Sequence, residues 1–373
     1  MIGRCTPLPS LEGRTTSTAI LETSGTRLSQ VIRPLVEQHP GLSGIYPLAD
    51  SEDAFAPRAH LAKLAERTLD VQYYMWKNDL TGTLLFEVLH AAADRGVRVR
   101  LLLDDNTTSG LDPTLAALDS HPNIEVRLFN PFVVRKPRIG YATDFMRANR
   151  RMHNKSFTAD NLVTIIGGRN IADEYFGAAG GLLFVDLDVG AAGPVVTDVS
   201  RDFDRYWASD SSYPADRIIG AVDPARIEEV ALAASDAERD PAAVAYMTAM
   251  RESPFVRRLV EGRLEFAWAR TRMISDDPAK GLGLAAPEKL FPQKLREIIG
   301  DPSDQVDLVA PYYIPTASGA DSFKNMAKRG LKVRVLTNSL AALDVPLVHA
   351  GYSKHRRALL DAGITLYEMH PLS

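Results

Sequence analysis

The chain has 373 residues, of which 45% are hydrophobic and 24% are charged, and its formal net charge is −4 at pH 7. This length suffices for two domains of an ordinary globular protein. The acidic balance argues against a nucleic-acid partner, and no run of about 18 apolar residues is present to form a membrane-spanning helix.

The first 43 residues are expected to form a tail followed by a helix. The start of the chain, Met1 to Cys5, lacks the apolar core of a secretory signal peptide. Cys5 is the only cysteine, so no intrachain disulfide can form. Two interpretations of Cys5 stay open: an unmodified residue of the tail, or a lipid-modified residue behind a signal that this sequence lacks.

Two parts of the chain repeat the same order of predicted elements. The first part has a strand at 69–76, a helix at 80–95, and strands at 97–103 and 124–131. The second part has a strand at 306–314, a helix at 318–329, and strands at 331–336 and 364–371. Each helix ends at a glycine, which is typical of a helix C-terminus. Strands separated by helices of this length predict βαβ units with mixed or parallel sheets.

We therefore predict an α/β protein with two tandem repeats flanked by helices, the second repeat being incomplete. The expected domains are 1–43 for the tail and helix, 44–215 for the first repeat, 216–263 for a helical connector, and 264–373 for the second repeat. The connector is rich in alanine, glutamate and arginine at helical spacing. A strand and helix at 44–67 correspond to a longer pair at 264–300.

The segment 153–160 carries the most informative pattern. An imidazole, an ammonium and a carboxylate are spaced H-x-K-x4-D, and a glycine pair and an amide follow. Positions two apart on a β-strand share a face, so His153 and Lys155 are expected to project side by side. That pair suits a phosphate. An ammonium binds phosphoryl oxygens, and an imidazole that is neutral near pH 7 is a nucleophile or a proton carrier.

The residues around this pair have candidate roles of their own. Asp160 is too far along the chain to share the strand face, and it could either orient a histidine or cap the local turn. Asn170 is a candidate for stabilising charge on the phosphate, and the glycine pair could let the backbone approach it. Two predicted strands end in Tyr-Tyr pairs, at 73–74 and 312–313, and one ring of each pair could face a cleft. The candidate substrate-binding residues are Asn170, Gly167, Gly168, Arg169 and Tyr74.

A locally basic segment, 135–151, precedes the motif. Its six cations against one aspartate could dock anionic headgroups, or they could form a solvated loop and helix face. The sequence has no His-Glu-x-x-His, no cysteine pair and no Walker loop. We therefore expect neither a metal nor a cofactor.

The spacing at 153–170 resembles the H-x-K-x4-D-x6-G-[GS]-x-N signature of the phospholipase D superfamily, and every specified position is met. The run Gly-Gly-Arg-Asn-Ile at 167–171 resembles that of bacterial cardiolipin synthases. Further segments resemble the same group, at 186–189, 193–196, 203–207, 275–280 and 348–352. The segment 180–184 departs from the pattern, because the corresponding strand in the family is more polar.

This resemblance implies a phosphatidyltransferase that acts through a phosphohistidine at His153, with Lys155 and Asn170 as phosphate ligands and Asp160 as support. It implies phospholipid substrates with anionic headgroups, at the periphery of a bacterial cell membrane on its cytoplasmic or periplasmic face. In two-repeat members, each repeat contributes one histidine to a shared active site.

This sequence has one H-x-K and ends two residues after Pro371, so a second motif in the corresponding place is not expected. We expect a strongly impaired monomer, because general acid–base help contributes about 10²–10⁴ to a rate. Two alternatives remain: a phosphodiesterase or nuclease assembled as a homodimer of single-motif chains, and an inactive fragment that retains lipid binding.

Overall fold

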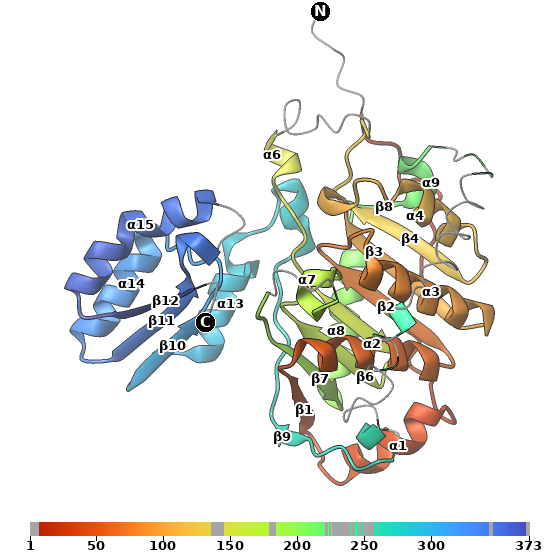
Figure 1. Cartoon of the computed structure of the whole chain (residues 1–373), viewed down its shortest axis with the longest axis horizontal. Coiled ribbons are helices and arrows are strands. Elements are labelled where there is room, and N and C mark those ends of the chain that lie inside the picture. Colours follow the sequence, from red (N-terminus) through yellow and green to blue (C-terminus); the bar gives the residue numbers. More distant parts are fainter. Residues whose placement is uncertain are drawn as a thin grey trace, which may run out of the picture. The chain divides into compact units, whose positions relative to one another are not determined.

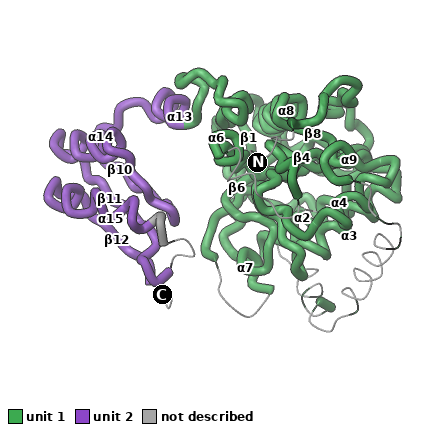
Figure 2. The backbone as a smooth tube through the Cα atoms, turned by 90° about the horizontal axis from the view of Figure 1, so that it is seen from above, with its two compact units in different colours: residues 1–291 green, residues 292–373 purple. Residues whose placement is uncertain are grey.

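A computed structural model of the chain describes residues 7–135, 145–178, 184–220, 261–342 and 346–370, with a few positions between 223 and 259. The chain divides into two compact units, 1–291 and 292–373 (Figure 2). The described part leaves out Cys5 and most of the predicted connector at 216–263. The predicted repeat boundaries stay a prediction. The units divide at a later point than 263/264 because a strand just after that boundary pairs within the first unit.

In the described part of the first unit, nine strands form one sheet in the order β8-β4-β3-β2-β5-β6-β7-β1-β9 (Figure 1). β2, β3 and β4 pair in parallel, and the other neighbours pair antiparallel. The expected mixed sheet is thus confirmed. The strands are β1(Ser43–Leu48), β2(Thr68–Tyr73), β3(Arg98–Asp104), β4(Ile124–Phe129), β5(Ser156–Ala159), β6(Val163–Gly167), β7(Asp188–Ala192), β8(Ser212–Pro214) and β9(Ala267–Ala269).

Helices flank this sheet, as the sequence predicts. The α-helices are α1(Arg27–Glu37), α2(Ser51–Leu64), α3(Leu80–Asp94), α4(Asp112–Asp119), α6(Phe145–Ala148), α7(Asp173–Phe176), α8(Pro194–Trp207) and α9(Ala215–Ile218). Short 3₁₀ helices are η1(Asp105–Thr107), η2(Pro278–Leu282) and η3(Pro287–Lys289). None of the helices in the described ranges is long and apolar enough to cross a bilayer.

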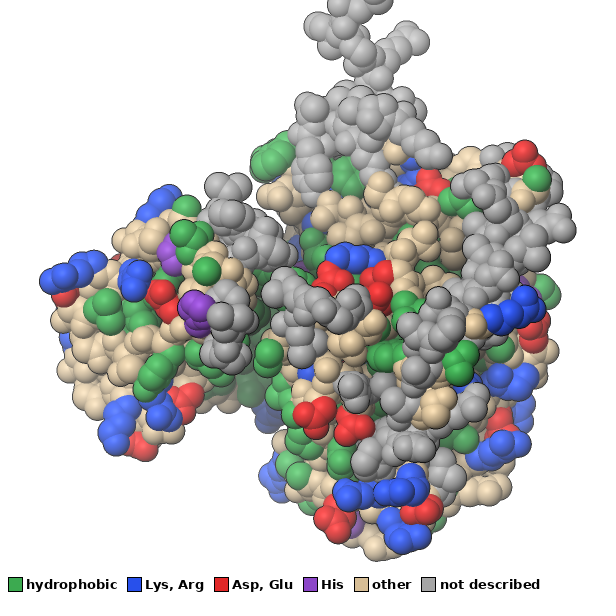
Figure 3. Space-filling view, viewed as in Figure 1, with side chains coloured by type: hydrophobic (Ala, Val, Ile, Leu, Met, Phe, Trp, Pro, Cys, Tyr) green, Lys and Arg blue, Asp and Glu red, His purple; other side chains and the backbone are tan. Residues whose placement is uncertain are grey.

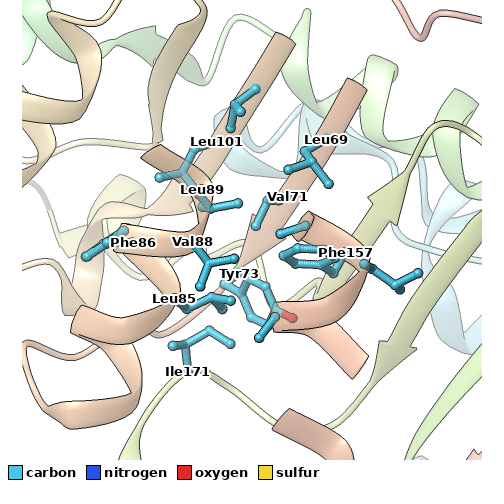
Figure 4. Close-up of a cluster of buried hydrophobic side chains, with 14 of the residues drawn as sticks. Leu69, Val71, Tyr73, Leu85, Phe86, Val88, Leu89, Leu101, Phe157 and Ile171 are labelled. Carbon is cyan, nitrogen blue, oxygen red and sulfur yellow. The ribbon is translucent and has the colours of Figure 1, made fainter. Parts of the chain in front are cut away.

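The core of the first unit lies between α3 and the central strands. Leu69, Val71 and Tyr73 alternate along β2 and share the face toward α3, where Leu85 and Leu89 meet them (Figure 4). Each is at most 1% exposed. Burying a side chain of this kind stabilises the fold by roughly 1.5–3 kcal/mol. The packed core therefore fixes the position of β2, from which the functional residues extend.

The opposite face of β2 carries an ion pair that recurs in the second unit. Asp70 accepts two hydrogen bonds from Arg100 on β3, at 2.7 and 2.8 Å, and the pair is buried under α8. In the second unit, Arg334 binds Asp307 in the same two-pronged way, at 2.6 and 2.6 Å. Both pairs join directly opposed residues of parallel strands. This correspondence supports the predicted internal repeat.

The N-terminal segment is part of the first unit because it supplies acceptors to arginines of the sheet. The carbonyls of Thr18 and Ser17 accept from Arg98 at 2.8 Å and Arg100 at 3.0 Å. The carbonyl of Thr15 likewise accepts from the β4 arginine, Arg127, at 2.7 Å. Buried guanidinium hydrogens need such acceptors, so this segment completes the α8 face of the sheet.

The second unit contains a parallel sheet in the order β10-β11-β12. Its core gathers buried residues such as Val333, Val335 and Leu359 beneath α14 and α15. This is the predicted βαβ arrangement. The elements are α13(Phe291–Ile299), β10(Gln305–Val309), α14(Ala317–Lys328), β11(Lys332–Asn338), η4(Leu340–Ala342), α15(Pro346–Asp361) and β12(Thr365–Met369).

Acidic and basic side chains alternate over the face of the molecule that Figure 3 shows. They do not gather there into one large patch of a single sign. This distribution agrees with the formal net charge of −4. The extended basic footprint that nucleic-acid binders carry is therefore not seen on that face.

Candidate active site

The H-x-K segment lies at the edge of the sheet where the parallel strands end. β2, β3 and β4 run in one direction and end at Tyr73, Asp104 and Phe129. β5 runs antiparallel to β2, so the residues just before β5 reach the same edge. The carboxyl ends of the strands are where open α/β sheets bind their ligands. The topology thus places this segment at the end of the sheet where proteins with such sheets bind ligands.

His153 and Lys155 lie next to each other, although not on a strand. β5 begins at Ser156, so the expectation that the pair shares a strand face is wrong in that detail. The Nζ atom of Lys155 lies 3.3 Å from Nδ1 of His153, and it donates to the carbonyl oxygen of His153 at 2.8 Å. The segment just before β5 therefore brings the ammonium and the imidazole together.

The protonation of the pair suits attack on a phosphate at neutral pH. His153 is exposed, but partial shielding of its ring from water, followed by the charges of Lys155 and Lys280, lowers the pKa of His153 to about 4. Lys155 is only 7% exposed, and its burial lowers the pKa of its ammonium to about 8. Nearby carboxylates act in the opposite direction, toward a higher pKa. At pH 7 the imidazole is therefore neutral and the lysine is charged.

Asp104, at the end of β3, anchors the chain immediately before the motif. Its buried carboxylate accepts hydrogen bonds from the backbone N–H of Met152 at 2.7 Å and from Arg151 at 3.1 Å. Burial raises the pKa of Asp104 to about 6. Sequence reasoning missed this residue. The signal that could have found it is an aspartate directly after the apolar run 101–103, at the carboxyl end of a parallel strand.

One tyrosine of the pair at 73–74 lies against the motif. The rings of Tyr74 and His153 have centroids 4.5 Å apart, and the Lys155 ammonium lies 5.6 Å from the Tyr74 centroid. Tyr73 instead points into the core, where its hydroxyl accepts from the Arg58 guanidinium at 2.7 Å. The structure therefore brings Tyr74 together with the two motif residues.

Asp160 lies at the opposite end of β5. With Asn161 it forms a tight turn with positive φ at both residues, a conformation that Asp and Asn tolerate well. Its buried carboxylate accepts from the backbone N–H groups of Glu66, Arg67 and Thr68 at 2.8–3.2 Å. At about 3.3 Å per residue, the four-residue strand alone separates it from His153 by roughly 13 Å. The structure thus does not bring Asp160 to this histidine.

The glycine pair lies where two carboxylates approach the backbone. A Cβ atom on Gly167 would lie 2.2 Å from Oδ1 of Asp188, and one on Gly168 would lie 1.9 Å from Oδ1 of Asp186. Both carboxylates favour the charged form of Lys155. Glycine is therefore needed here because the start of β7 packs directly against the end of β6.

Asn170 and Arg169 are buried and bound within the protein. Oδ1 of Asn170 accepts from the backbone of Met75 at 3.1 Å, and Nδ2 donates to the hydroxyl of Tyr175 at 3.0 Å. An amide nitrogen has two hydrogens, so one donor of Asn170 is left over from these bonds. The guanidinium of Arg169 donates to the carbonyls of Leu48 and Ala49 at 2.8 and 2.5 Å. Arg169 thus ties β6 to the end of β1.

The basic segment before the motif is largely tied into the fold. Arg135 pairs with Asp105 at 2.8 Å, and Arg147 donates to the carbonyl of Pro131 at 2.9 Å. Arg151 donates to Asp104, as described above. Lys136 and Arg138 lie outside the described residues. Headgroup docking by the six cations therefore stays a prediction.

No group of three or more His, Cys, Asp or Glu residues suited to a metal ion is found within the described ranges. A neutral imidazole, a nearby ammonium and an aromatic ring meet at an open edge of the sheet. Such a set can bind a phosphodiester and attack its phosphorus.

Comparisons with known proteins agree with this arrangement. The model of the family described as "Cardiolipin synthase, PLD-like domain" matches residues 59–207. Cardiolipin synthase C of Escherichia coli K12 is 53% identical over 346 residues, which are 92% of this chain and 73% of that protein. An uncharacterized protein of Helicobacter pylori is 31% identical over 90% of this chain and 67% of its own length.

Among solved structures, phosphatidylserine synthase from Haemophilus influenzae Rd KW20 superposes with a TM-score of 0.56 at 11% identity. The superposition covers 92% of this chain and 79% of that structure. At this identity the likeness concerns the fold alone.

Proposed function

The chain belongs to the phospholipase D superfamily, in the group of the cardiolipin synthases, and from this membership we propose that it is a phosphatidyltransferase that joins two phospholipids. The observation that carries the proposal is the contact between Lys155 and His153 at the carboxyl edge of the sheet. The neutral imidazole is the nucleophile, and the ammonium binds the phosphoryl oxygens.

The reaction has two displacements at one phosphorus. In the first, a ring nitrogen of His153 attacks the phosphodiester of the donor lipid, and the bond from phosphorus to the headgroup oxygen breaks. The headgroup leaves as an alcohol after taking a proton, and the phosphatidyl group stays on the histidine. In the second, a headgroup hydroxyl of another phospholipid attacks the phosphorus and loses its proton, and the bond from phosphorus to nitrogen breaks.

The contact with Lys155 decides which nitrogen of His153 is ready to attack. An ammonium can only donate, so in the resting site Nδ1 accepts and the proton of the neutral ring stays on Nε2. Attack through Nε2 requires that proton on Nδ1. We propose that a bound phosphate draws Lys155 onto its own oxygens and so releases Nδ1. Substrate binding and activation of the nucleophile are then coupled.

Other residues support these two. The remaining amide hydrogen of Asn170 is assigned to a phosphate oxygen, and the Tyr74 ring holds the imidazole in place. Gly167 and Gly168 position the strand pair that carries the carboxylates beside Lys155. Asp160 is assigned a positioning role, since its carboxylate holds the start of β2.

The leaving headgroup needs a proton donor that we assign to no residue of this chain. The 373 residues contain H-x-K once. General acid–base catalysis typically speeds a reaction by about 10²–10⁴-fold. Without an assigned proton donor, we therefore expect slow transfer by this chain alone. If two chains form one active site, the rate per chain will rise with protein concentration. Gel filtration at the same concentrations should then show a change from monomer to dimer.

Phospholipid substrates place the reaction at a bacterial membrane, and we propose a peripheral association. The test is product analysis with purified chain and phosphatidylglycerol vesicles. Transfer predicts cardiolipin and free glycerol in equal amounts. Phosphatidic acid as the main product would instead identify a hydrolase, and neither product together with no binding of the headgroup would contradict the proposal.

The pH dependence of the first displacement follows from the two perturbed pKa values. Attack needs neutral His153, so the rate should fall as the pH drops below about 4. Binding needs charged Lys155, so the rate should fall as the pH rises above about 8. The measurement is release of p-nitrophenolate from a p-nitrophenyl phosphodiester, whose leaving group needs no proton donor.

Lys155→Arg serves as the matched variant. A guanidinium stays charged at alkaline pH, so the fall in rate above about pH 8 should disappear in this variant. An acidic limb near pH 6.5, the ordinary range for histidine, would contradict the lowered pKa of His153.

A further inference from the structure

The segment 275–283 lies against the H-x-K motif, although it is far away in the chain. The hydroxyl of Ser275 donates to Oδ1 of Asp202 on α8 at 2.5 Å. The amide of Asn154 donates to Oδ2 of the same carboxylate at 3.4 Å. Asn154 is the middle residue of the motif, so one carboxylate joins the two segments.

Further contacts fix this segment in place. The hydroxyl of Tyr206 donates to the carbonyl of Asp276 at 3.1 Å. Asp277 caps η2 by accepting from the backbone of Ala279 at 2.9 Å. A Cβ atom on Gly281 would lie 2.5 Å from the Ser211 hydroxyl, so the helix packs closely on its neighbours. The position of η2 relative to the motif is therefore well defined.

Lys280 is the charged residue of η2, in the segment that Asp202 joins to the motif. Its ammonium pairs with the carboxylate of Asp276, and each side chain is 21% exposed. The Lys280 charge contributes to the lowered pKa of His153. An ammonium has three hydrogens, so the pair with one carboxylate leaves donors for a second anion. Lys280 is thus a partly exposed cation on a segment hydrogen-bonded, through Asp202, to a motif whose own lysine is buried.

We propose that Lys280 is a second phosphate-binding group, which holds the phosphate of the acceptor phospholipid while Lys155 holds the scissile phosphate. This inference rests on the proposed function. Transfer between two phospholipids brings two phosphodiester anions to one nucleophile, and their repulsion in a partly dry site requires a cation for each. Hydrolysis would bring only one such anion. Lys155 is in contact with the nucleophile, so the scissile phosphate is assigned to it and the acceptor to Lys280.

The test compares two soluble headgroups that lack acyl chains. Bis(glycerophospho)glycerol carries two phosphodiesters, and glycerophosphoglycerol carries one. Binding is followed through the ring protons of His153 by NMR. The wild-type chain should bind the two-phosphate headgroup at least about tenfold more tightly, the effect of one charge-assisted contact. Lys280→Gln should reduce this preference to about twofold, the statistical advantage of two equivalent groups.

Two variants control for indirect effects. Lys289→Gln removes an exposed lysine of η3, the next short helix along the chain, and should keep the preference. Lys280→Arg keeps the charge and should retain most of it. A Lys280→Gln chain with an unchanged preference, or a wild-type chain with none, overturns the inference.

Inorganic phosphate distinguishes the source of the anion. If Lys280→Gln weakens binding of free phosphate as much as binding of the two-phosphate headgroup, Lys280 is a general anion site and the acceptor assignment fails. If the wild-type chain binds neither headgroup, the proposed function itself fails.

Discussion

His153→Ala is expected to lower the release of p-nitrophenolate from a p-nitrophenyl phosphodiester by at least about 10³-fold. The reason is that the variant loses the only group that we assign to attack on phosphorus, and water at the same position is a far weaker nucleophile. The fold should be unchanged, because the His153 side chain is exposed. The measurement is the initial rate at pH 7 under saturating substrate.

The matched control is His90→Ala. His90 lies on α3, is 43% exposed and pairs with Asp94, so its loss should leave the rate within twofold of wild type. A His153→Ala chain that retains more than a tenth of the wild-type rate would mean that another group attacks phosphorus.

Asp160→Ala is expected to destabilise the protein by about 2–4 kcal/mol, because the buried backbone N–H group of Thr68 and the partly buried ones of Glu66 and Arg67 lose their acceptor. At a temperature where the variant is folded, its rate per folded molecule should stay close to that of wild type. Denaturant unfolding measures the loss of stability, and p-nitrophenolate release measures the rate per folded molecule.

Asp160→Asn refines this expectation. An asparagine oxygen can still accept from the backbone N–H groups of Arg67 and Thr68. The free energy of unfolding should therefore fall by only about 1–2 kcal/mol. Asp210→Ala, at an exposed loop position, should leave the unfolding midpoint unchanged. If Asp160→Ala kept full stability but lost activity, Asp160 would orient a histidine after all, the other role that its sequence position allows.

The repeated strands and helices of both units could be predicted from the sequence, because their apolar periodicity is strong. Helix 80–95 was expected and α3(Leu80–Asp94) is found, and strand 97–103 corresponds to β3(Arg98–Asp104). The proximity of His153 and Lys155 also followed from their spacing. These features depend on residues that are near one another in the chain.

The partners of the site could not be predicted, because they depend on how distant strands align. Asp160 was a candidate for orienting a histidine, and only the pairing of β5 with β2 reveals that its carboxylate reaches residues 66–68. Asp104 was missed although its place directly after the apolar run 101–103 is a signal in the sequence, but its bond to the backbone of Met152 could not be foreseen. The segment around Lys280 was noted for its resemblance to the family, but its position beside Asn154 requires α8 between them.

The most direct test of the account is a search for the covalent intermediate. The chain is mixed with a p-nitrophenyl phosphodiester, quenched in alkali to protect the phosphorus–nitrogen bond, digested, and analysed by mass spectrometry. The account predicts a burst of about one p-nitrophenolate per active chain and a phosphoramidate adduct on His153 alone, in which phosphorus keeps one ester group and is bonded to the ring nitrogen. Steady release without a burst, or an adduct on any other residue, would contradict it.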